Sequence, residues 1–364
     1  MRGIFGFFAA IAIAMGTPAQ SGEPGRETEP GLQRIVAVGD LHGDFDAWEE
    51  IAIAAGIADR KGEWIGGEAI LVQLGDITDR GPDSLKIIRY LQKLDKSAQD
   101  SGGDVVVLLG NHEAMNVTGD LRYVHPGEYE AFRDRRSEAR REATWKANRE
   151  RIEAFYLAEN PELMPEQMKQ KWFDETPLGM LAHRRAWRPG GELGEWAAGL
   201  QAIAKIGSTL FVHGGLSEEA TREPIDAVNQ RHSSALQPGS EIERTILTDP
   251  LGPLWYRGNV RREPTPDGEG DSVAVRPGRD EEIAIVLGRY GAKRLVVAHT
   301  PSLEGIVTDL DHRLVRIDTG ISSYYGGPAS FLEIVGDRVT AYRRQDGGDW
   351  SATVLGRPEQ GEPD

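Results

Sequence analysis

Three apolar segments near the start of the chain are each followed by a polar, glycine-rich stretch and then by a helical pattern. The segments are residues 34–38, 69–74 and 104–109, and their nearly continuous apolar content is typical of buried parallel strands. After the first segment, apolar residues between Phe45 and Ala55 recur at the spacing of one helix face. Consecutive strand–loop–helix units of this kind predict neighbouring parallel strands joined by right-handed crossovers.

The pattern changes between about residues 119 and 198, where the sequence is charged and favourable for helices. We expect a helical insertion here that packs over or beside the functional site, where substrate choice could be determined. Its tryptophans favour packing between helices over a substrate platform. The arginines of residues 133–141 favour a solvated helix face with glutamate partners, and the alternative is a phosphate-attracting patch.

Strand patterns return after the insertion. A polar, glycine-rich loop at residues 318–327 lies between the last two predicted strand pairs and is expected to close one wall of the site. A helix is predicted over residues 280–290. The predicted strands lie at residues 202–206, 209–212 and 294–298 and, as antiparallel pairs, within residues 305–318 and 330–341.

The N-terminus has the pattern of a secretory signal peptide. A short basic start precedes an apolar run over residues 3–15, and small residues follow it. The run is too short to span a bilayer comfortably, which argues against the alternative of a permanent anchor. We therefore expect cleavage near Ala19 and a secreted or periplasmic protein without stable membrane insertion.

These patterns predict the organisation of the whole chain. A signal peptide at residues 1–19 is followed by a linker at residues 20–31, which has almost no apolar content. One catalytic domain is expected over residues 32–346, containing the helical insertion. The tail at residues 347–364 is expected to be disordered.

Composition narrows the possible functions. A chain of 364 residues that is 39% hydrophobic can bury a large core. Its 58 acidic and 42 basic side chains give a formal charge of -16, which argues against nonspecific nucleic-acid binding. Because the chain has no cysteine, any metal ion must be held by oxygen and imidazole nitrogen.

Polar side chains that suit metal ions follow each of the early strands. Because the carboxyl ends of neighbouring parallel strands meet at one edge of a sheet, these side chains are expected to converge. The alternative is a set of isolated surface turns. Three different polar loops after three successive apolar strands favour a shared site over that alternative. Two further histidines follow later apolar strands. The candidates are Asp40, His42, Asp76, Asp79, Asn111, His112, His213 and His299.

Aspartate, asparagine and histidine ligands without cysteine suit a binuclear site for Mn²⁺, Fe or Zn²⁺, and manganese is the first choice. Asp76 is the best candidate for a bridging carboxylate, because it stands on the loop between the other early ligands. One metal is assigned to Asp40, His42 and Asp76, and the second to Asp76, Asn111, His213 and His299.

A pair of cations can lower the pKa of a shared water and stabilise its direct in-line attack at phosphorus. His112 is then free to protonate the leaving oxygen while Asp79 orients its ring. Arg80 and Arg257 would neutralise the phosphoryl oxygens, although a surface salt bridge is the alternative for Arg257. Asn111 and Tyr324 are further candidates for substrate contact.

These residues resemble a known family. The signature of the calcineurin-like metallophosphoesterases is similar to five motifs of this chain, of which the first is Gly39-Asp40-x-His42-Gly43. The Asp79-Arg80 pair and the Asn111-His112-Glu113 segment resemble motifs of the phosphoprotein phosphatase superfamily, and residues 115–124 and 318–327 resemble its Shewanella-like branch, including bacterial members. The other motifs are Gly75-Asp76-x-x-Asp79-Arg80-Gly81, Gly110-Asn111-His112-Glu113, His213-Gly214-Gly215 and His299.

The resemblance implies an α/β fold with a central mixed β-sandwich flanked by helices, two divalent metal ions, and hydrolysis of phosphomonoesters. Phosphopeptides carrying phosphoserine, phosphothreonine or phosphotyrosine are the implied substrates, with small phosphomonoesters beside them. Ala298 stands where glycine often precedes the last histidine, and the insertion is long. These departures leave substrate class and the role of Arg257 open.

Two other functions are compatible with the motifs. One is a hydrolase of dinucleotide polyphosphates, resembling the diadenosine tetraphosphatases. The other is a noncatalytic periplasmic protein that uses metals to hold a phosphorylated ligand, and the presence of both His112 and Asp79 argues against it. The oligomeric state is not predicted.

Overall fold

The computed structural model describes residues 32–240, 244–262 and 276–356. The predicted signal peptide and linker lie outside the described residues, as do residues 357–364 of the tail. Within the described ranges, no helix is both long enough and apolar enough to cross a membrane.

The first sheet contains the three early strands in parallel, as the sequence predicts. Its strand order is β11-β10-β9-β1-β2-β3, and β9 joins β1 in antiparallel fashion, with Arg34 opposite Val335. The strands are β1 (Arg34–Val38), β2 (Ile70–Gln73), β3 (Asp104–Val107), β9 (Ser330–Val335), β10 (Arg338–Arg344) and β11 (Trp350–Val354).

The second sheet has the order β4-β5-β6-β8-β7. Its central strands β5, β6 and β8 are parallel, whereas β4 and β7 are antiparallel edge strands. The strands are β4 (Ile203–Ile206), β5 (Thr209–Val212), β6 (Arg294–Val297), β7 (Val307–Asp309) and β8 (Leu314–Arg316).

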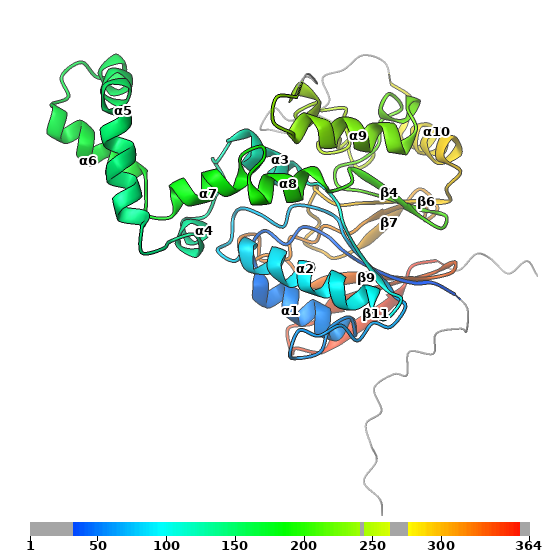
Figure 1. Cartoon of the computed structure of the whole chain (residues 1–364). Coiled ribbons are helices and arrows are strands. Elements are labelled where there is room, and N and C mark those ends of the chain that lie inside the picture. Colours follow the sequence, from blue (N-terminus) through cyan, green and yellow to red (C-terminus); the bar gives the residue numbers. More distant parts are fainter. Residues whose placement is uncertain (1–31, 241–243, 263–275, 357–364) are drawn as a thin grey trace, which may run out of the picture. The chain divides into compact units, whose positions relative to one another are not determined.

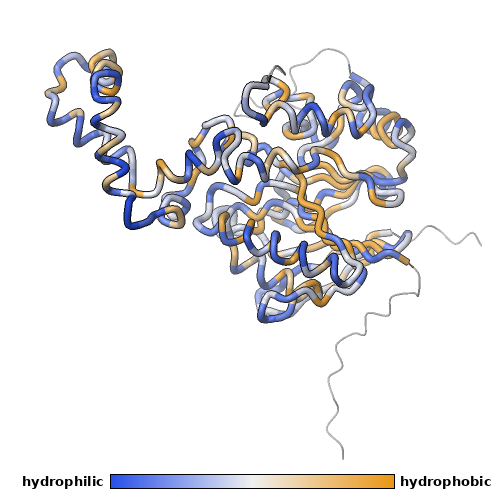
Figure 2. Tube along the Cα trace, in the orientation of Figure 1, coloured by the Kyte–Doolittle hydropathy of each residue, from blue (hydrophilic) through white to orange (hydrophobic). Residues whose placement is uncertain are grey.

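The two sheets pack face to face, and strand β1 shows how alternation achieves this. Ile35 and Ala37 join a core shared with Phe211 and Val296 of the second sheet. The intervening Val36 and Val38 belong to the other core, which includes the helices. Successive side chains of a strand point to opposite faces, so a strand with apolar residues on both is buried on both. Figure 2 shows this apolar content along the strands.

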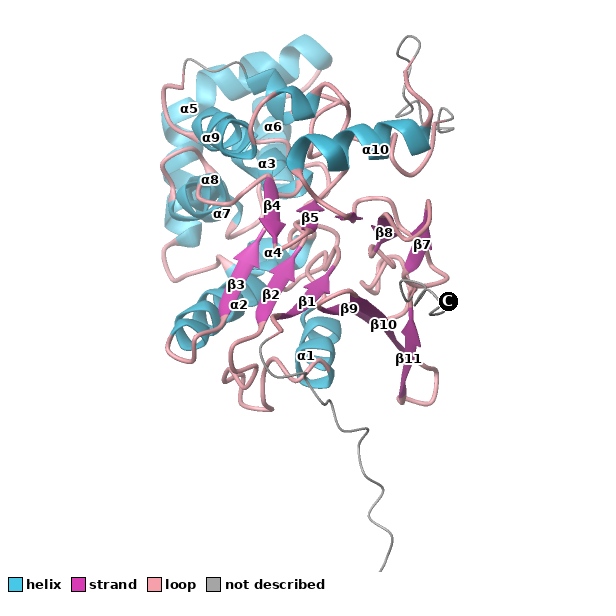
Figure 3. Cartoon of the chain, turned by 90° about the vertical axis from the view of Figure 1, so that its right-hand side faces the viewer, coloured by secondary structure: helices cyan, strands magenta, loops and turns pink. Residues whose placement is uncertain are grey.

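Helices flank the sandwich (Figures 1 and 3). Asp44 caps the first of them, because its Oδ1 accepts a hydrogen bond of 3.0 Å from the Ala47 amide. The mixed β-sandwich flanked by helices confirms the expected fold class. The flanking helices are α1 (Phe45–Ala54), α2 (Ser84–Gln99), α3 (Asn111–Thr118), α9 (Ile225–Leu236) and α10 (Arg279–Tyr290), with short 3-10 turns at Ala220–Arg222 and Arg244–Leu247.

Five helices occupy the predicted insertion. Helices α7 and α8 contact α3, but α5 and α6 project away from the sheets (Figure 1) and enclose a small core of Trp145, Tyr156 and Met168. The arm formed by α5 and α6 therefore does not cover the strand ends. The helices are α4 (Pro126–Ala131), α5 (Ser137–Glu159), α6 (Pro165–Glu175), α7 (Met180–Trp187) and α8 (Glu192–Ala198).

The tryptophans of the insertion pack between its helices, and several of its arginines form ion pairs. Trp145 packs against Trp172 at a ring-centroid distance of 5.7 Å, so these tryptophans join helices. Arg133 and Arg140 form ion pairs with carboxylates of Glu130 and Asp134. Arg133 lies in the exposed loop before α5, whereas Arg141 on α5 packs over the Phe173 ring, so only part of this arginine-rich segment is the solvated helix face that was expected.

The prediction of a disordered tail is wrong for the part that forms β11. This strand pairs with β10 from Thr340 to Arg344, and the Trp350 ring lies 5.4 Å from that of Phe331. Unpaired backbone at the edge of β10 and one large apolar ring outweigh the polar composition of the surrounding tail.

Candidate active site

Glycines allow the polar loops after β1, β2 and β3 to touch one another. A Cβ atom on Gly43 would lie 2.6 Å from backbone atoms of Gly81, and one on Gly75 would lie 2.6 Å from those of Gly110. Both Gly43 and Gly75 also have positive φ, which residues with side chains rarely adopt. The loops that carry the candidate ligands therefore approach to backbone contact.

Several polar residues of these loops have left-handed backbone conformations. Such conformations cost about 1–3 kcal/mol each and concentrate at functional sites, where the surrounding structure enforces them. The backbone carbonyl of Asp76 accepts hydrogen bonds from the amides of Leu41 and His42 and so ties two loops together. On these loops the polar residues with positive φ are His42 (43°), Asp76 (52°), Asp79 (71°) and Arg80 (66°), and His299 (62°) after β6 shares this conformation.

The Glu113 carboxylate ties the loops after β2 and β3 together through hydrogen bonds to their backbone amides, a role that was not predicted from the sequence. Its buried Oε2 accepts hydrogen bonds from the amides of Asp76 at 2.9 Å and Gly110 at 3.0 Å. Its Oε1 accepts from the amides of Ile77 at 2.9 Å and Thr78 at 3.2 Å. The only sequence signal for this role is the position of Glu113 directly after His112.

One group of potential ligand atoms surrounds His213. The carbonyl of Leu74 lies 2.8 Å from His213 Nδ1 and can only accept, so Nδ1 donates and Nε2 presents its lone pair to the site. That Nε2 lies 2.9 Å from Asn111 Oδ1, 3.1 Å from His299 Nδ1 and 3.3 Å from Asp76 Oδ2. A cation among these close, buried acceptor atoms would offset their mutual repulsion, and their chemistry suits a divalent metal ion.

The charges at this group agree with that interpretation. Burial by itself would lower the pKa of His213, but the carboxylates of Asp76 and Asp40 raise it to about 9. Burial opposes ionisation of Asp76, yet the neighbouring imidazoles of His213 and His112 hold the pKa of Asp76 well below its usual range. Asp76 is therefore held in its ionised form among these potential ligand atoms.

A second group is centred on His42 and shares Asp76. His42 Nδ1 donates to the Thr78 carbonyl at 2.9 Å, which leaves Nε2 facing inward, 3.8 Å from both Asp40 Oδ2 and Asp76 Oδ2. The six predicted metal ligands thus come together, with Asp76 common to both groups. By distance alone, His112 also joins the group of His42 and Asp76.

Asp40 is held among other carboxylates at this site. Burial and the charge of Asp318 raise the pKa of Asp40, while its Oδ1 accepts a hydrogen bond of 3.2 Å from the His299 amide. Burial likewise raises the pKa of Asp318 to about 6. Asp318 belongs to the loop expected to close one wall, and the structure places that loop beside the site.

His112 and Asp79 form the predicted pair. His112 Nδ1 lies 2.6 Å from Asp79 Oδ2, and both side chains are buried. Asn116 donates from Nδ2 to Asp79 Oδ1 at 2.9 Å and to the His112 carbonyl at 3.0 Å, so it fixes both partners. Asn116 was not among the residues predicted from the sequence, and the signal for it is its place one turn after His112 on α3.

The predicted substrate contacts also lie at the site. Arg80 Nη1 donates to His42 Nε2 at 2.5 Å, and the Arg80 Cζ lies 5.7 Å from the centre of the exposed Tyr324 ring. Arg257 is half-buried and close to His299, whose pKa is lowered first by burial and then by the Arg257 charge.

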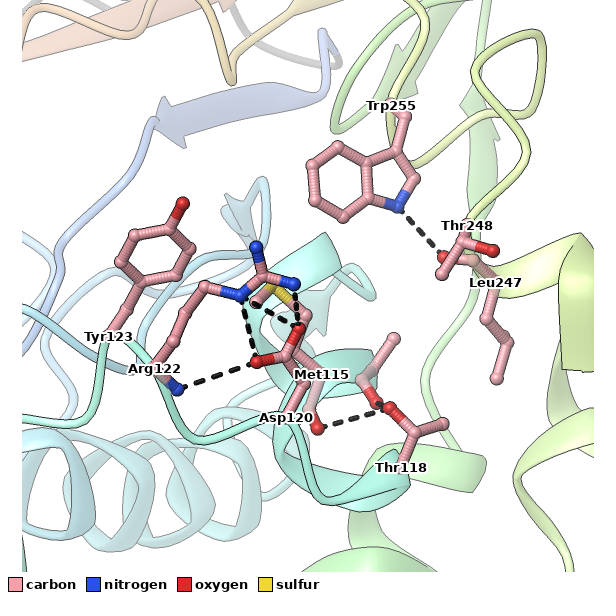
Figure 4. A pocket seen from close by; sticks show the side chains of 9 residues that line it. Met115, Thr118, Asp120, Arg122, Tyr123, Leu247, Thr248 and Trp255 are labelled. Atoms are coloured by element: carbon pink, nitrogen blue, oxygen red, sulfur yellow. Dashed lines mark hydrogen bonds and ion pairs between the residues drawn. The ribbon is translucent and has the colours of Figure 1, made fainter. Parts of the chain in front are cut away.

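A cavity of about 280 Å³ has Tyr123 and Trp255 among its lining residues (Figure 4). The Tyr123 ring on its wall lies 5.1 Å from the His112 ring, and Trp255 lies 5.7 Å from His299. Asp120 and Arg122 form an ion pair at its edge, and Met115 and Leu247 supply apolar surface. The cavity could accept one side chain next to the phosphate.

Known proteins resemble this chain over most of its length. The sequence profile of the calcineurin-like phosphoesterase family matches residues 33–303. The chain is 33% identical over 302 residues to an uncharacterised protein of Schizosaccharomyces pombe, covering 82% of this chain and 76% of that protein. It is 30% identical over 304 residues to Shewanella-like protein phosphatase 2 of Arabidopsis thaliana, covering 80% of this chain and 72% of that protein.

A solved structure supports the fold. The cold-active protein-tyrosine phosphatase of a psychrophilic Shewanella species superimposes with a TM-score of 0.61 at 23% sequence identity. The match covers 88% of this chain and 80% of that chain. At this identity the likeness bears on the fold alone.

Proposed function

The chain belongs to the calcineurin-like phosphoesterase family and is a metal-dependent phosphoester hydrolase, and from this premise we propose that it is an exported phosphatase of phosphoproteins. The proposal rests mainly on one observation: the His112–Asp79 pair, at 2.6 Å, lies next to two groups of metal-binding side chains that share Asp76. Export is proposed from the pattern of residues 1–19 alone.

We assign the two metal ions to the two ligand groups predicted from the sequence, with manganese as the first choice. When bound, two divalent cations would activate a water molecule and neutralise charge on the phosphoryl group. The residues that would hold them are Asp40, His42, Asp76, Asn111, His213 and His299. All are buried, with at most 6% of each residue exposed, and the Nε2 lone pair of His213 points into the site, which supports the assignment.

His112 supplies the leaving group with a proton. Asp79 accepts the Nδ1 hydrogen at 2.6 Å and thereby fixes the ring, which leaves Nε2 to donate its proton to the departing oxygen. Arg80 and Arg257 bind the phosphoryl oxygens and neutralise their charge in the transition state. No covalent intermediate with a side chain is needed.

A protein substrate agrees with the surroundings of the site. The cavity lined by Tyr123 and Trp255 is large enough for one side chain, and its wall combines apolar groups with the Asp120–Arg122 ion pair. The Arabidopsis relative carries the name of a protein phosphatase, and the Shewanella neighbour that of a protein-tyrosine phosphatase. We therefore propose phosphopeptides, including those with phosphotyrosine, as substrates.

The test measures phosphate release from phosphoserine, phosphothreonine and phosphotyrosine peptides and from a dinucleotide polyphosphate. The protein is first treated with a chelator and then supplied with Mn²⁺, Fe²⁺ or Zn²⁺. We expect metal-restored release from the peptides and none from Asp76→Asn. Preference for the dinucleotide would support the alternative hydrolase, and full activity of Asp76→Asn would refute the proposal.

Catalysis and export need separate tests. A His112→Asn variant that loses hydrolysis but still binds inorganic phosphate would exclude a mere binding protein. Expression of the full chain followed by fractionation tests export, and recovery of only uncleaved chain in the cytoplasm would contradict it.

A further inference from the structure

Arg80 is surrounded by tyrosine rings. Its Cζ lies 5.0 Å from the ring centre of Tyr325, 5.3 Å from that of Tyr123 and 5.7 Å from that of Tyr324. Tyr324 and Tyr325 are themselves in edge-to-face contact, with centroids 5.0 Å apart and an angle of 86°. Each distance falls within the range of about 6 Å at which a guanidinium is attracted to an aromatic face.

The described carboxylates near Arg80 do not pair with it directly, although Asp318 is close enough for the Arg80 charge to favour its ionised form. In the part of the chain that the structure describes, no ion pair joins Arg80 to an aspartate or glutamate within 4.0 Å. Other arginines of this acidic chain do have such partners, for example Arg34 with Glu333 and Arg262 with Glu282. A carboxylate partner would compete with phosphoryl oxygens for the N–H groups of Arg80, whereas an aromatic face does not occupy them.

Hydrogen bonds hold in place the two segments that carry these rings. The Arg80 amide donates to the Tyr123 carbonyl at 2.9 Å, which fixes that segment to the catalytic loop. The Ser323 amide donates to Asp44 Oδ2 at 2.7 Å, and the Tyr325 amide donates to the Ser322 carbonyl at 2.9 Å. The segment with Tyr324 and Tyr325 is thus anchored to the start of α1.

We propose that Tyr123, Tyr324 and Tyr325 are positioning residues that hold the Arg80 guanidinium over the site by cation–π contacts and leave its N–H groups, apart from the one bonded to His42, for the substrate phosphate. This inference rests on the proposed role of Arg80 in binding the phosphoryl group. Tyr325 contributes most, because its ring is closest to Arg80 and is only partly exposed, so water weakens the contact least.

The experiment compares Tyr325→Leu with Tyr325→Phe in the metal-loaded full chain, in the parent and in an Arg80→Ala background. The measured quantities are kcat and KM for p-nitrophenyl phosphate, the inhibition constant of inorganic phosphate, and the thermal midpoint. Phe155→Leu is the matched control, because it truncates an exposed ring on α5, in the projecting arm.

We expect Tyr325→Leu to raise KM and the phosphate inhibition constant about fivefold, which corresponds to about 1 kcal/mol. The kcat should change by less than about twofold, Tyr325→Phe should resemble the parent because it retains the ring, and Phe155→Leu should change none of these quantities. In the Arg80→Ala background, Tyr325→Leu should add less than about twofold, because the guanidinium it positions is gone.

Different failures have different meanings. If Tyr325→Leu has the same effect with and without Arg80, or if Tyr325→Phe is as impaired as Tyr325→Leu, the positioning role is refuted while the proposed function stands. A fall in kcat and thermal midpoint with unchanged KM would also refute it, because that result indicates a structural role only. If Arg80→Ala itself leaves KM and phosphate inhibition unchanged, the proposed function loses its phosphate ligand as well.

Discussion

Replacing Glu113 by glutamine tests how the catalytic loops are held together. The carboxylate of Glu113 accepts hydrogen bonds from four backbone amides, two at each oxygen, and is fully buried. In Glu113→Gln one oxygen becomes an NH₂ group, so two of these amides face a donor and lose their acceptor. The substitution changes size very little, and its effect is therefore one of hydrogen bonding.

The magnitude follows from those two amides. A buried N–H group without an acceptor costs about 1–3 kcal/mol, so two cost about 2–6 kcal/mol. Loss of a buried charge offsets part of this cost, since burial and the Asp76 charge raise the pKa of Glu113 and so oppose its ionised form. We expect the free energy of unfolding to fall by about 2–4 kcal/mol.

Urea denaturation measures this change, and phosphate release measures its functional consequence. The Asp76 amide is one of the affected groups, so the position of Asp76 should shift and kcat should fall at least about tenfold. Glu63→Gln is the control, because Glu63 is 55% exposed in its ion pair with Lys93 and should change stability by less than about 1 kcal/mol. Stability and kcat of Glu113→Gln equal to those of the parent would refute the reasoning.

Three other predictions concern separate parts of the molecule. His112→Asn and Asp79→Asn should each lower kcat by about 10²–10⁴-fold while the metal content, measured by mass spectrometry, stays unchanged; loss of metal instead would make His112 a ligand. Trp350→Ala should lower the free energy of unfolding in urea by about 1–3 kcal/mol, and no change would mean that β11 adds nothing to stability. Burial raises the pKa of Glu128 from 4.5 to about 8, so the folded form binds this proton more tightly than the unfolded form does. The free energy of unfolding should therefore fall as pH rises between these values, by up to about 1.4 kcal/mol per pH unit. Glu128→Gln should flatten this pH dependence in urea titrations, and an unchanged slope would contradict the prediction.

The local order of the chain was predictable from its sequence. The strand predicted at residues 34–38 is β1, and Asp44 begins the helix that follows it, because apolar runs and capping residues act over a few positions. Convergence of Asp40, Asp76 and Asn111 was also predictable, since parallel strands of consecutive units end at one edge of a sheet. These features need no information about distant parts of the chain.

Pairing between distant segments was not predictable from residue patterns. The antiparallel mixture within the sheets followed only from the family resemblance, because β1 pairs with β9 about three hundred residues later and no local pattern specifies that partner. The order of β11 likewise depends on an edge strand and a ring at Phe331. The projecting arm of α5 and α6 is similar, since helical periodicity gives the helices and not their direction.

The sequence by itself determined which chemical groups this protein possesses and which loops carry them. Tertiary structure alone decided that Glu113 would hold the loops, that Asn116 would fix Asp79, and that Tyr325 would reach Arg80 across the fold. The physical reason is that ligand types and glycine turns are local properties, whereas the partners of a buried polar group are chosen by packing between segments far apart in the chain.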